Sequence, residues 1–362
     1  MREMSGDWSL RPGGMTPRER MKALLSGRPI DRTPFYPFAR SFCAIQAGMS
    51  LETFFSDPAS SLEAQLWTKI MLDHDEVLKF GGGCYGAWEF GGTVKPPTSD
   101  LQQSMSVERH PVQSEEDVER LELPDIAVAG SIPRTMEFCK LQHAAGLVCS
   151  VSVGTPFLIA GNICGIDRLS RWLLKKPVLA HRVLRLATDF GVAVAKHWLD
   201  TFGPDNVDIR ESAPTDSNQV ISPKHFRDFS FPYLMELHER VLGLGARYIY
   251  SHICGEQNLN LPLWRELPFG DPGIASFGHE VDVTKAVEML GDKCIIVGNV
   301  EPRIIQTESP RTVYERSREC LEKGKQGPRG FILAAGCELP PKAPAANVFA
   351  MKKAIDDFGW YE

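Results

Sequence analysis

Short apolar runs alternate with longer amphipathic stretches along most of the chain. The runs at 294–298 and 331–335 are almost continuously apolar, which is typical of strands buried on both faces. Helical patterns separate the later runs, as at 223–244, where Pro223 follows Ser222 at a helix start. The candidate strands are 34–38, 76–80, 147–153, 207–210, 248–252, 274–277, 294–298 and 331–335. Eight strands with intervening helices predict an α/β fold, a (β/α)8 TIM barrel, with an open doubly wound sheet as the alternative.

The same pattern predicts one domain. We expect a flexible lead-in at 1–14 and a single barrel domain at 15–362, with Thr16 and Pro17 at the start of its first helix. The stretch 84–146, after the second strand, is too long for a plain connection. It contains two short runs suited to a hairpin and then a helical run, at 88–94, 105–110 and 115–121. We therefore expect an insertion that covers one rim of the barrel.

Three side chains suited to a metal ion follow the ends of two predicted strands. His252 and Cys254 are two residues apart at the end of the fifth strand, and side chains at that spacing point the same way in an extended chain. Cys337 follows the eighth strand, so it belongs to the same C-terminal rim, where barrel active sites lie. One imidazole and two thiols suit Zn²⁺ and leave a coordination position open for chemistry. The alternative is that the thiols and the histidine are ordinary core residues.

Other polar residues also follow predicted strands. Glu211 follows the fourth strand, and we consider it as a catalytic residue, a fourth metal ligand or a carboxylate that orients His252; the alternative is a salt bridge. His279, after the sixth strand, is a second catalytic candidate, and Asn299, after the seventh, a substrate contact, although either could cap a turn. Arg40 follows the first strand and could pair with an anionic substrate group.

Composition narrows the class of partner. The chain has 362 residues, with 40 Lys and Arg against 46 Asp and Glu, and a formal net charge of −6. A mildly acidic chain without a long basic run is a poor candidate for binding nucleic acid or an anionic membrane. No uncharged apolar stretch is long enough to span a bilayer. The nine cysteines are spread thinly, and the N-terminus has no apolar core of a secretory signal, so we expect a cytoplasmic protein.

Four segments carry a resemblance to a known family. They are TPRERMKALLSGRPIDRTP at 16–34, SHICG at 251–255, GDKCIIVGNVEP at 291–302 and AGCELPP at 335–341. Together they resemble the uroporphyrinogen decarboxylase superfamily over nearly the whole chain. That resemblance implies a (β/α)8 barrel independently of the strand pattern.

Two branches of this superfamily differ in their motifs. The decarboxylases have an arginine-rich segment after the first strand that holds substrate carboxylates, whereas 35–48 keeps only Arg40 here. The other branch consists of corrinoid-linked methyltransferases, of the methylcobalamin:coenzyme M and O-demethylase types, with a His-x-Cys motif and a distant Cys. His252, Cys254 and Cys337 match that motif. The resemblance to this branch implies zinc on these three residues and a corrinoid (cobalamin) carried by a separate corrinoid protein.

The resemblance leaves several functions open. We favour demethylation of an aryl methyl ether, because aromatic residues gather between 35 and 90, and Tyr85 and Trp88 are candidate substrate contacts. The first alternative is methylation of a coenzyme M-like thiol. Uroporphyrinogen decarboxylation is disfavoured by the missing arginines, and a barrel that binds a ligand or a corrinoid protein without turnover is the non-enzymatic alternative. The oligomeric state is left open, with a homodimer as one option.

Overall fold

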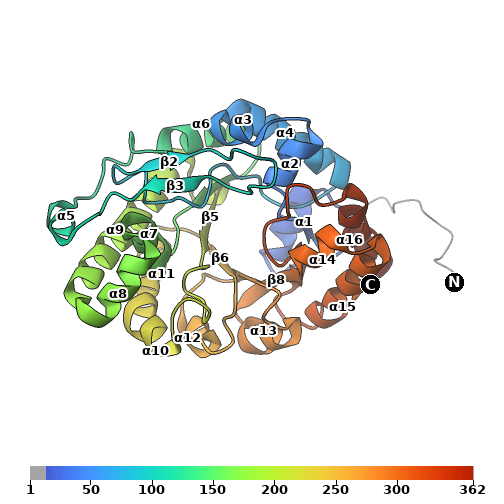
Figure 1. Cartoon of the computed structure of the whole chain (residues 1–362). Helices are drawn as coiled ribbons and strands as arrows, with labels where there is room; N and C mark the ends of the chain where they lie inside the picture. Colours follow the sequence, from blue (N-terminus) through green and yellow to red (C-terminus); the bar gives the residue numbers. More distant parts are fainter. Residues whose placement is uncertain (1–13, 362) are drawn as a thin grey trace.

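Seven parallel strands form the centre of the molecule and helices surround them (Figure 1). The structure is a computed structural model that describes residues 14–361, so most of the expected lead-in lies outside the described residues. The strands follow one another around the sheet in the order β1-β9-β8-β7-β6-β5-β4. Their bounds are β1 Phe35–Tyr36, β4 Cys149–Ser152, β5 Val207–Ser212, β6 Ile249–Ile253, β7 Gly273–Phe277, β8 Cys294–Val300 and β9 Phe331–Ala335. This arrangement confirms the predicted barrel class, and seven of the eight predicted strands are present.

The predicted strand at 76–80 is wrong. This segment lies beside β1, where the Asp75 N–H donates to the Phe35 carbonyl, but it forms no strand ladder. Side chains bind its backbone instead: Gln65 Nε2 donates to the Lys79 carbonyl at 3.0 Å, and Gln142 Nε2 donates to the Leu78 carbonyl at 2.8 Å. An apolar run predicts burial, but it does not predict that glutamine side chains will replace a neighbouring strand.

Helices cover the outside of the sheet, and their starts follow local sequence rules. Ser309 caps α15 through the Thr312 N–H, with Pro310 in the first turn. The single helix expected at 223–244 is divided into α10, a π-helical turn η2 and α11. The large outer helices are α4 Pro58–Leu72, α6 Ile132–Ala144, α7 Pro156–Cys164, α8 Ile166–Lys175, α9 Pro177–Phe202, α11 Phe231–Gly243, α13 Val283–Leu290, α15 Pro310–Gly324 and α16 Ala345–Phe358. The shorter ones are α2 Ser41–Gln46, α3 Leu51–Ser56, α5 Glu115–Arg120, η1 Pro204–Asn206, α10 Pro223–His225, η2 Phe226–Ser230, α12 Leu261–Glu266 and α14 Pro302–Thr307.

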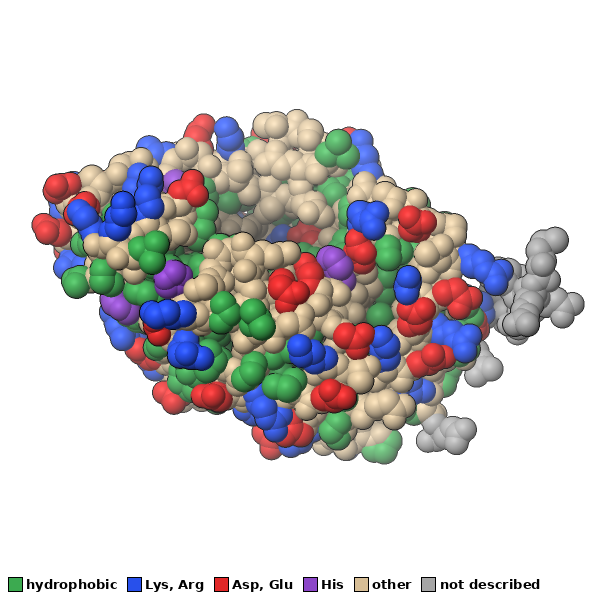
Figure 2. Space-filling model, turned by 60° about the horizontal axis from the view of Figure 1, so that its bottom comes forward, with side chains coloured by type: hydrophobic (Ala, Val, Ile, Leu, Met, Phe, Trp, Pro, Cys, Tyr) green, Lys and Arg blue, Asp and Glu red, His purple; other side chains and the backbone are tan. Residues whose placement is uncertain are grey.

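Helix α1 (Pro17–Leu24) lies at the N-terminal end of the barrel, behind the ring in Figure 1. Thr16 caps it, as the sequence predicts, and its Met21 and Leu24 pack with inward-facing barrel residues such as Tyr36 and Tyr250. The opposite, C-terminal end, where the strands finish, is hollowed at its centre and forms the open end of the barrel (Figure 2). A further cavity of about 510 Å³ lies beside α1 at the N-terminal end. The main hydrophobic core lies between the strands and the surrounding helices.

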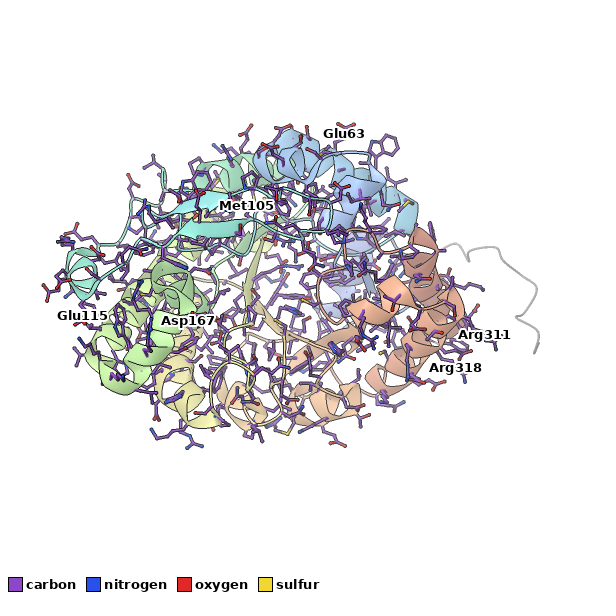
Figure 3. The ribbon with its side chains drawn as sticks, in the orientation of Figure 1. Glu63, Met105, Glu115, Asp167, Arg311 and Arg318 are labelled. Carbon is purple, nitrogen blue, oxygen red and sulfur yellow. The ribbon has the colours of Figure 1, made fainter. Side chains whose placement is uncertain are left out.

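A small antiparallel hairpin lies over the C-terminal end of the barrel (Figure 1). It consists of β2 (Thr93–Lys95) and β3 (Ser106–Arg109), within the stretch where the insertion is expected. Met105, labelled in Figure 3 beside β3, accepts a hydrogen bond from the Cys84 thiol at 3.2 Å. Gln103, in the hairpin loop, donates to the carbonyls of Glu338 and Leu339 at 3.3 and 3.2 Å. The hairpin is thus attached to the loop that carries Cys337.

In the described part of the chain, no helix is long and apolar enough to cross a membrane.

Candidate metal centre

His252 lies at the end of β6, with one ring nitrogen fixed and the other without a partner. In the sheet it pairs with Ser276 of β7, and its Nδ1 lies 3.0 Å from the Ser276 hydroxyl. Its Nε2 is buried and has no hydrogen-bond partner among residues 14–361. A buried imidazole nitrogen without a partner is costly, unless it is reserved for a ligand or a metal ion.

The thiols of Cys254 and Cys337 meet beside this nitrogen. Cys254 directly follows β6 and Cys337 follows β9, and a hydrogen bond between the two thiols lowers the pKa of Cys337 to about 3, with His252 acting in the same direction. The same contact, together with burial, raises the pKa of Cys254 well above its usual range. The structure therefore brings together the three residues that the sequence singles out, and Cys337 is the one that favours the thiolate form.

The donor atoms of His252, Cys254 and Cys337 suit zinc, but the three side chains are not arranged in a coordination geometry. Two thiols and an unpartnered imidazole nitrogen are ligands that zinc prefers. Within residues 14–361, however, no group of three or more His, Cys, Asp and Glu side chains has the arrangement of a ready metal site. Binding zinc at the usual ~2.0–2.3 Å would therefore require side-chain adjustment around His252, Cys254 and Cys337.

Glu280 is a carboxylate beside the cluster that the sequence reasoning did not identify. Its Oε2 is buried without a hydrogen-bond partner in the described residues, and His279 Nδ1 lies 3.5 Å away. Its negative charge also raises the pKa of the Cys254 thiol, after the larger effects of Cys337 and burial. Gly278 permits this approach: a Cβ there would collide with Glu280 Oε2 and lie 3.4 Å from the Cys254 Cα. The sequence signal that could have identified Glu280 is its position, because it follows a strand that ends at the same rim.

Arg40 lies next to the cluster, but its charge is already paired. Its Nε and Nη2 donate to the Glu338 carboxylate at 3.0 and 2.6 Å, and its Nη1 donates to the Gly81 carbonyl at 2.5 Å. The other Glu338 oxygen accepts from the Ser41 hydroxyl at 2.8 Å. Arg40 therefore anchors the residue that follows Cys337, and its role in binding an anionic substrate group stays a prediction.

Glu211 cannot serve as the fourth ligand in this arrangement. In the sheet it pairs with Ser251, whereas its neighbour Ser212 pairs with His252. Adjacent residues of a strand point to opposite faces, so Glu211 points away from the cluster, towards the helices. There its Oε1 lies 2.8 Å from His238 Nε2 of α11 and accepts from the Ser251 hydroxyl at 2.6 Å. Its proposed catalytic role is corrected for the same reason.

Asn299 and His279 both lie near the rim, but the Asn299 side chain is hydrogen-bonded to the backbone and the His279 side chain is exposed. Asn299 donates to the carbonyls of Gly278 and Val281 at 2.9 and 2.7 Å, so both amide hydrogens hold the loop after β7. Its expected role as a substrate contact stays a prediction. The His279 side chain is 41% exposed, which leaves it free to meet a ligand, and its catalytic role remains a prediction.

The two aromatic candidates from the insertion lie in different surroundings. Tyr85 is 5% exposed, and its buried hydroxyl has no hydrogen-bond partner in the described residues. Trp88 is half-buried, with the Arg134 guanidinium 5.4 Å from its ring centre. Neither contact involves the cluster, so their role as substrate contacts stays a prediction. The aromatic ring that meets the cluster is Phe38, edge-on to His252 with 4.9 Å between ring centres.

These features define an α/β barrel with a His-Cys-Cys cluster at its open end, and Figure 2 shows the centre of the ring as a hollow in the surface. The chain belongs to the uroporphyrinogen decarboxylase family, whose model matches residues 16–358.

Curated relatives extend over almost the whole chain. It is 26% identical over 352 residues to the methylcobamide:CoM methyltransferase MtbA of Methanosarcina acetivorans, covering 95% of this chain and 98% of that protein. It is 23% identical over 359 residues to the methylcobamide:CoM methyltransferase MtaA of Methanosarcina barkeri, with the same coverage of 95% and 98%. A solved methyltransferase structure from Methanosarcina mazei matches with a TM-score of 0.80 and 22% identity, over 95% of this chain and 99% of the other, which supports the fold.

Proposed function

We propose that this protein is a zinc-dependent methyltransferase that moves a methyl group between the cobalt of a separate corrinoid protein and a small thiol. The observation that carries the proposal is His252 Nε2, which is buried beside the Cys254 and Cys337 thiols at the open end of the barrel and has no hydrogen-bond partner among the described residues. The names of the relatives, methylcobamide:CoM methyltransferases, support the corrinoid and the thiol.

Each residue of the cluster has a definable task in this reaction. Ser276 fixes the ring of His252, so that Nε2 faces the thiols. Glu338, held by Arg40 and Ser41, fixes the backbone next to Cys337. His252, Cys254 and Cys337 would hold zinc, which lowers the pKa of a bound thiol and so supplies a thiolate at neutral pH. Two thiolates and one neutral imidazole balance the charge of the metal, which leaves a modest Lewis acid.

Glu280 is the candidate for a fourth side chain that would hold the metal. Its buried Oε2 lies near Cys254 without a hydrogen-bond partner in the described residues, and carboxylate oxygen is an accepted zinc ligand. A metal held there would lie at the open end of the barrel, where a small thiol and the corrinoid protein could both approach.

Aryl-ether demethylation has less support from the packing than thiol methylation. Of the aromatic residues between 35 and 90, Phe35 and Phe42 are fully buried in the core, and Tyr85 is almost fully buried. Phe38 alone among the aromatic candidates of that stretch has a described contact with the cluster. Uroporphyrinogen decarboxylation is weaker still, because Arg40 is paired with Glu338 and offers no free charge to a carboxylate.

We propose a cytoplasmic location as well, because all nine cysteines are free. We then expect the protein to act without a membrane or nucleic acid partner. Whether it forms a homodimer is tested by sedimentation of the purified chain.

The test combines metal content with methyl transfer. Purified protein should hold about one zinc per chain by elemental analysis, as a three-ligand catalytic site implies. It should demethylate methylated corrinoid protein in the presence of a thiol, which is followed by the absorbance change of the cobalt. A protein without zinc, or one that transfers methyl only from aryl ethers to cob(I)alamin, would contradict the proposal. Turnover with free methylcobalamin as good as with the protein-bound form would contradict the dedicated partner.

A further inference from the structure

The side-chain amine of Lys79 lies close to the cluster, next to Phe38. Its backbone is fixed by Gln65, which accepts from the Lys79 N–H at 3.1 Å and donates to the Lys79 carbonyl at 3.0 Å. Its side chain is half-buried, and within residues 14–361 its Nζ forms neither a hydrogen bond nor an ion pair. The described contact of Nζ is the ring of Phe38, whose centre lies 3.7 Å away.

The carboxylates near Lys79 attract its charge but contact other groups. Glu76 Oε2 accepts from the Phe38 N–H at 2.8 Å, and its Oε1 lies 3.9 Å from Arg210. Glu338 is held by Arg40 at 2.6 Å. Within the described residues Lys79 therefore has no ion-pair partner, and burial lowers its pKa to about 7; Glu76 raises this pKa, whereas Arg210 and Arg40 lower it. An anion beside Nζ would favour the protonated, charged form.

Phe38 connects Lys79 to the metal cluster. Its ring has the ammonium on one side at 3.7 Å and the His252 imidazole edge-on at 4.9 Å between ring centres. Its backbone has a φ of 61°, a left-handed conformation that is strained for a bulky residue. The fold therefore holds the Phe38 ring in place despite the backbone strain. This ring lies between the Lys79 ammonium and the cluster.

We propose that Lys79 binds the negatively charged group of the substrate, a carboxylate or a sulfonate, while the reacting atom of the same molecule lies at His252, Cys254 and Cys337. The inference rests on the proposed function, and it makes Lys79 a specificity-determining residue for small organic anions. Phe38 forms the apolar wall along which the linker of the substrate lies. A charged hydrogen bond to the ammonium selects an acid over a neutral analogue, because the neutral group leaves the cation unpaired.

The first experiment compares acceptors that differ in charge. Wild type, Lys79→Met and Lys79→Arg are assayed with methylcobalamin and either 3-mercaptopropionate, 2-mercaptoethanesulfonate or the neutral 2-mercaptoethanol. For Lys79→Met we expect a rise of about tenfold or more in the KM for both anionic thiols, which is the usual loss for a charged hydrogen bond, whereas the KM for the neutral thiol stays unchanged. Lys79→Arg should retain most of the preference. Lys140→Met, at an exposed lysine of α6, is the matched control and should change nothing.

A binding measurement separates this inference from methyl transfer itself. Ethanesulfonate, which has no thiol, is titrated into each variant by calorimetry. Weaker binding to Lys79→Met than to wild type and Lys140→Met supports the anion subsite, even if no variant transfers a methyl group, in which case the proposed function alone fails. Equal binding to all variants, or equal KM changes for anionic and neutral thiols, overturns the role of Lys79. Circular dichroism of Lys79→Met verifies that the variant folds.

Discussion

Asp216→Asn should make the protein more stable at neutral pH and leave it nearly unchanged in mild acid. Asp216 lies in the loop after β5 and is 0% exposed. Its carboxylate accepts hydrogen bonds from the hydroxyls of Ser230 and Thr155, the latter at 2.9 Å. Burial nevertheless raises the pKa of the Asp216 carboxyl from 3.8 to about 6, because two hydroxyl donors do not replace the lost hydration.

The sign and size of the effect follow from this shift. The folded protein binds the Asp216 proton more tightly than the unfolded chain, so the unfolding free energy falls as pH rises from about 4 to about 6. A shift of about two pH units corresponds to ~3 kcal/mol, at 1.36 kcal/mol per unit. An asparagine has no charge at any of these pH values, and its amide can still pair with both hydroxyls. The stability of the variant relative to wild type should therefore increase by up to ~3 kcal/mol between pH 4 and 7.

Urea unfolding at several pH values between 4.5 and 7.5, followed by tryptophan fluorescence, measures this difference. Asp167→Asn is the control for the same substitution at an exposed position of α8 (Figure 3). If the Asp216→Asn difference is flat, or falls as pH rises, the carboxyl does not have a raised pKa and the reasoning from burial is refuted.

Three further predictions test the cluster, the barrel floor and the branch of the family. Cys337→Ala should lose zinc by elemental analysis and lose methyl transfer, with the circular dichroism of the fold retained; a collapse of the fold would mean that the metal is structural. Asp75→Asn should destabilise the protein by about 3–5 kcal/mol in urea, because Asp75 is buried between Arg20 at 2.5 Å and Arg32 at 3.1 Å and both would lose a charged partner. Uroporphyrinogen should not be converted to coproporphyrinogen, as detected by fluorescence chromatography, because Arg40 is occupied by Glu338.

The barrel and the three cluster residues could be predicted because both depend on local patterns. Parallel strands end at one rim, so a His-x-Cys motif after one strand and a Cys after another must lie close together. Long-range pairing could not be predicted in the same way. Arg40 and Glu338 are separated by 298 positions, and no local rule states that one neutralises the other. The failure at 76–80 has the same origin, because Gln142 lies 64 positions from the carbonyl that it binds.

The register between β5 and β6 decides which carboxylate can reach the cluster. Since Ser212 is opposite His252, Glu211 is opposite Ser251 and faces the helices, and a shift of one residue would have reversed both. The sequence shows that Glu211 lies at the end of a strand, but it does not show how β5 is aligned with β6. Glu280 escapes this constraint because it lies in the loop after β7, where Gly278 lets the chain approach Cys254. Side chains in a loop do not alternate between two faces as those in a strand do. A carboxylate in the loop after a strand can therefore reach the site when the residue at the end of the strand cannot. Residues just beyond a strand are thus as strong candidates for a site as those at its last position.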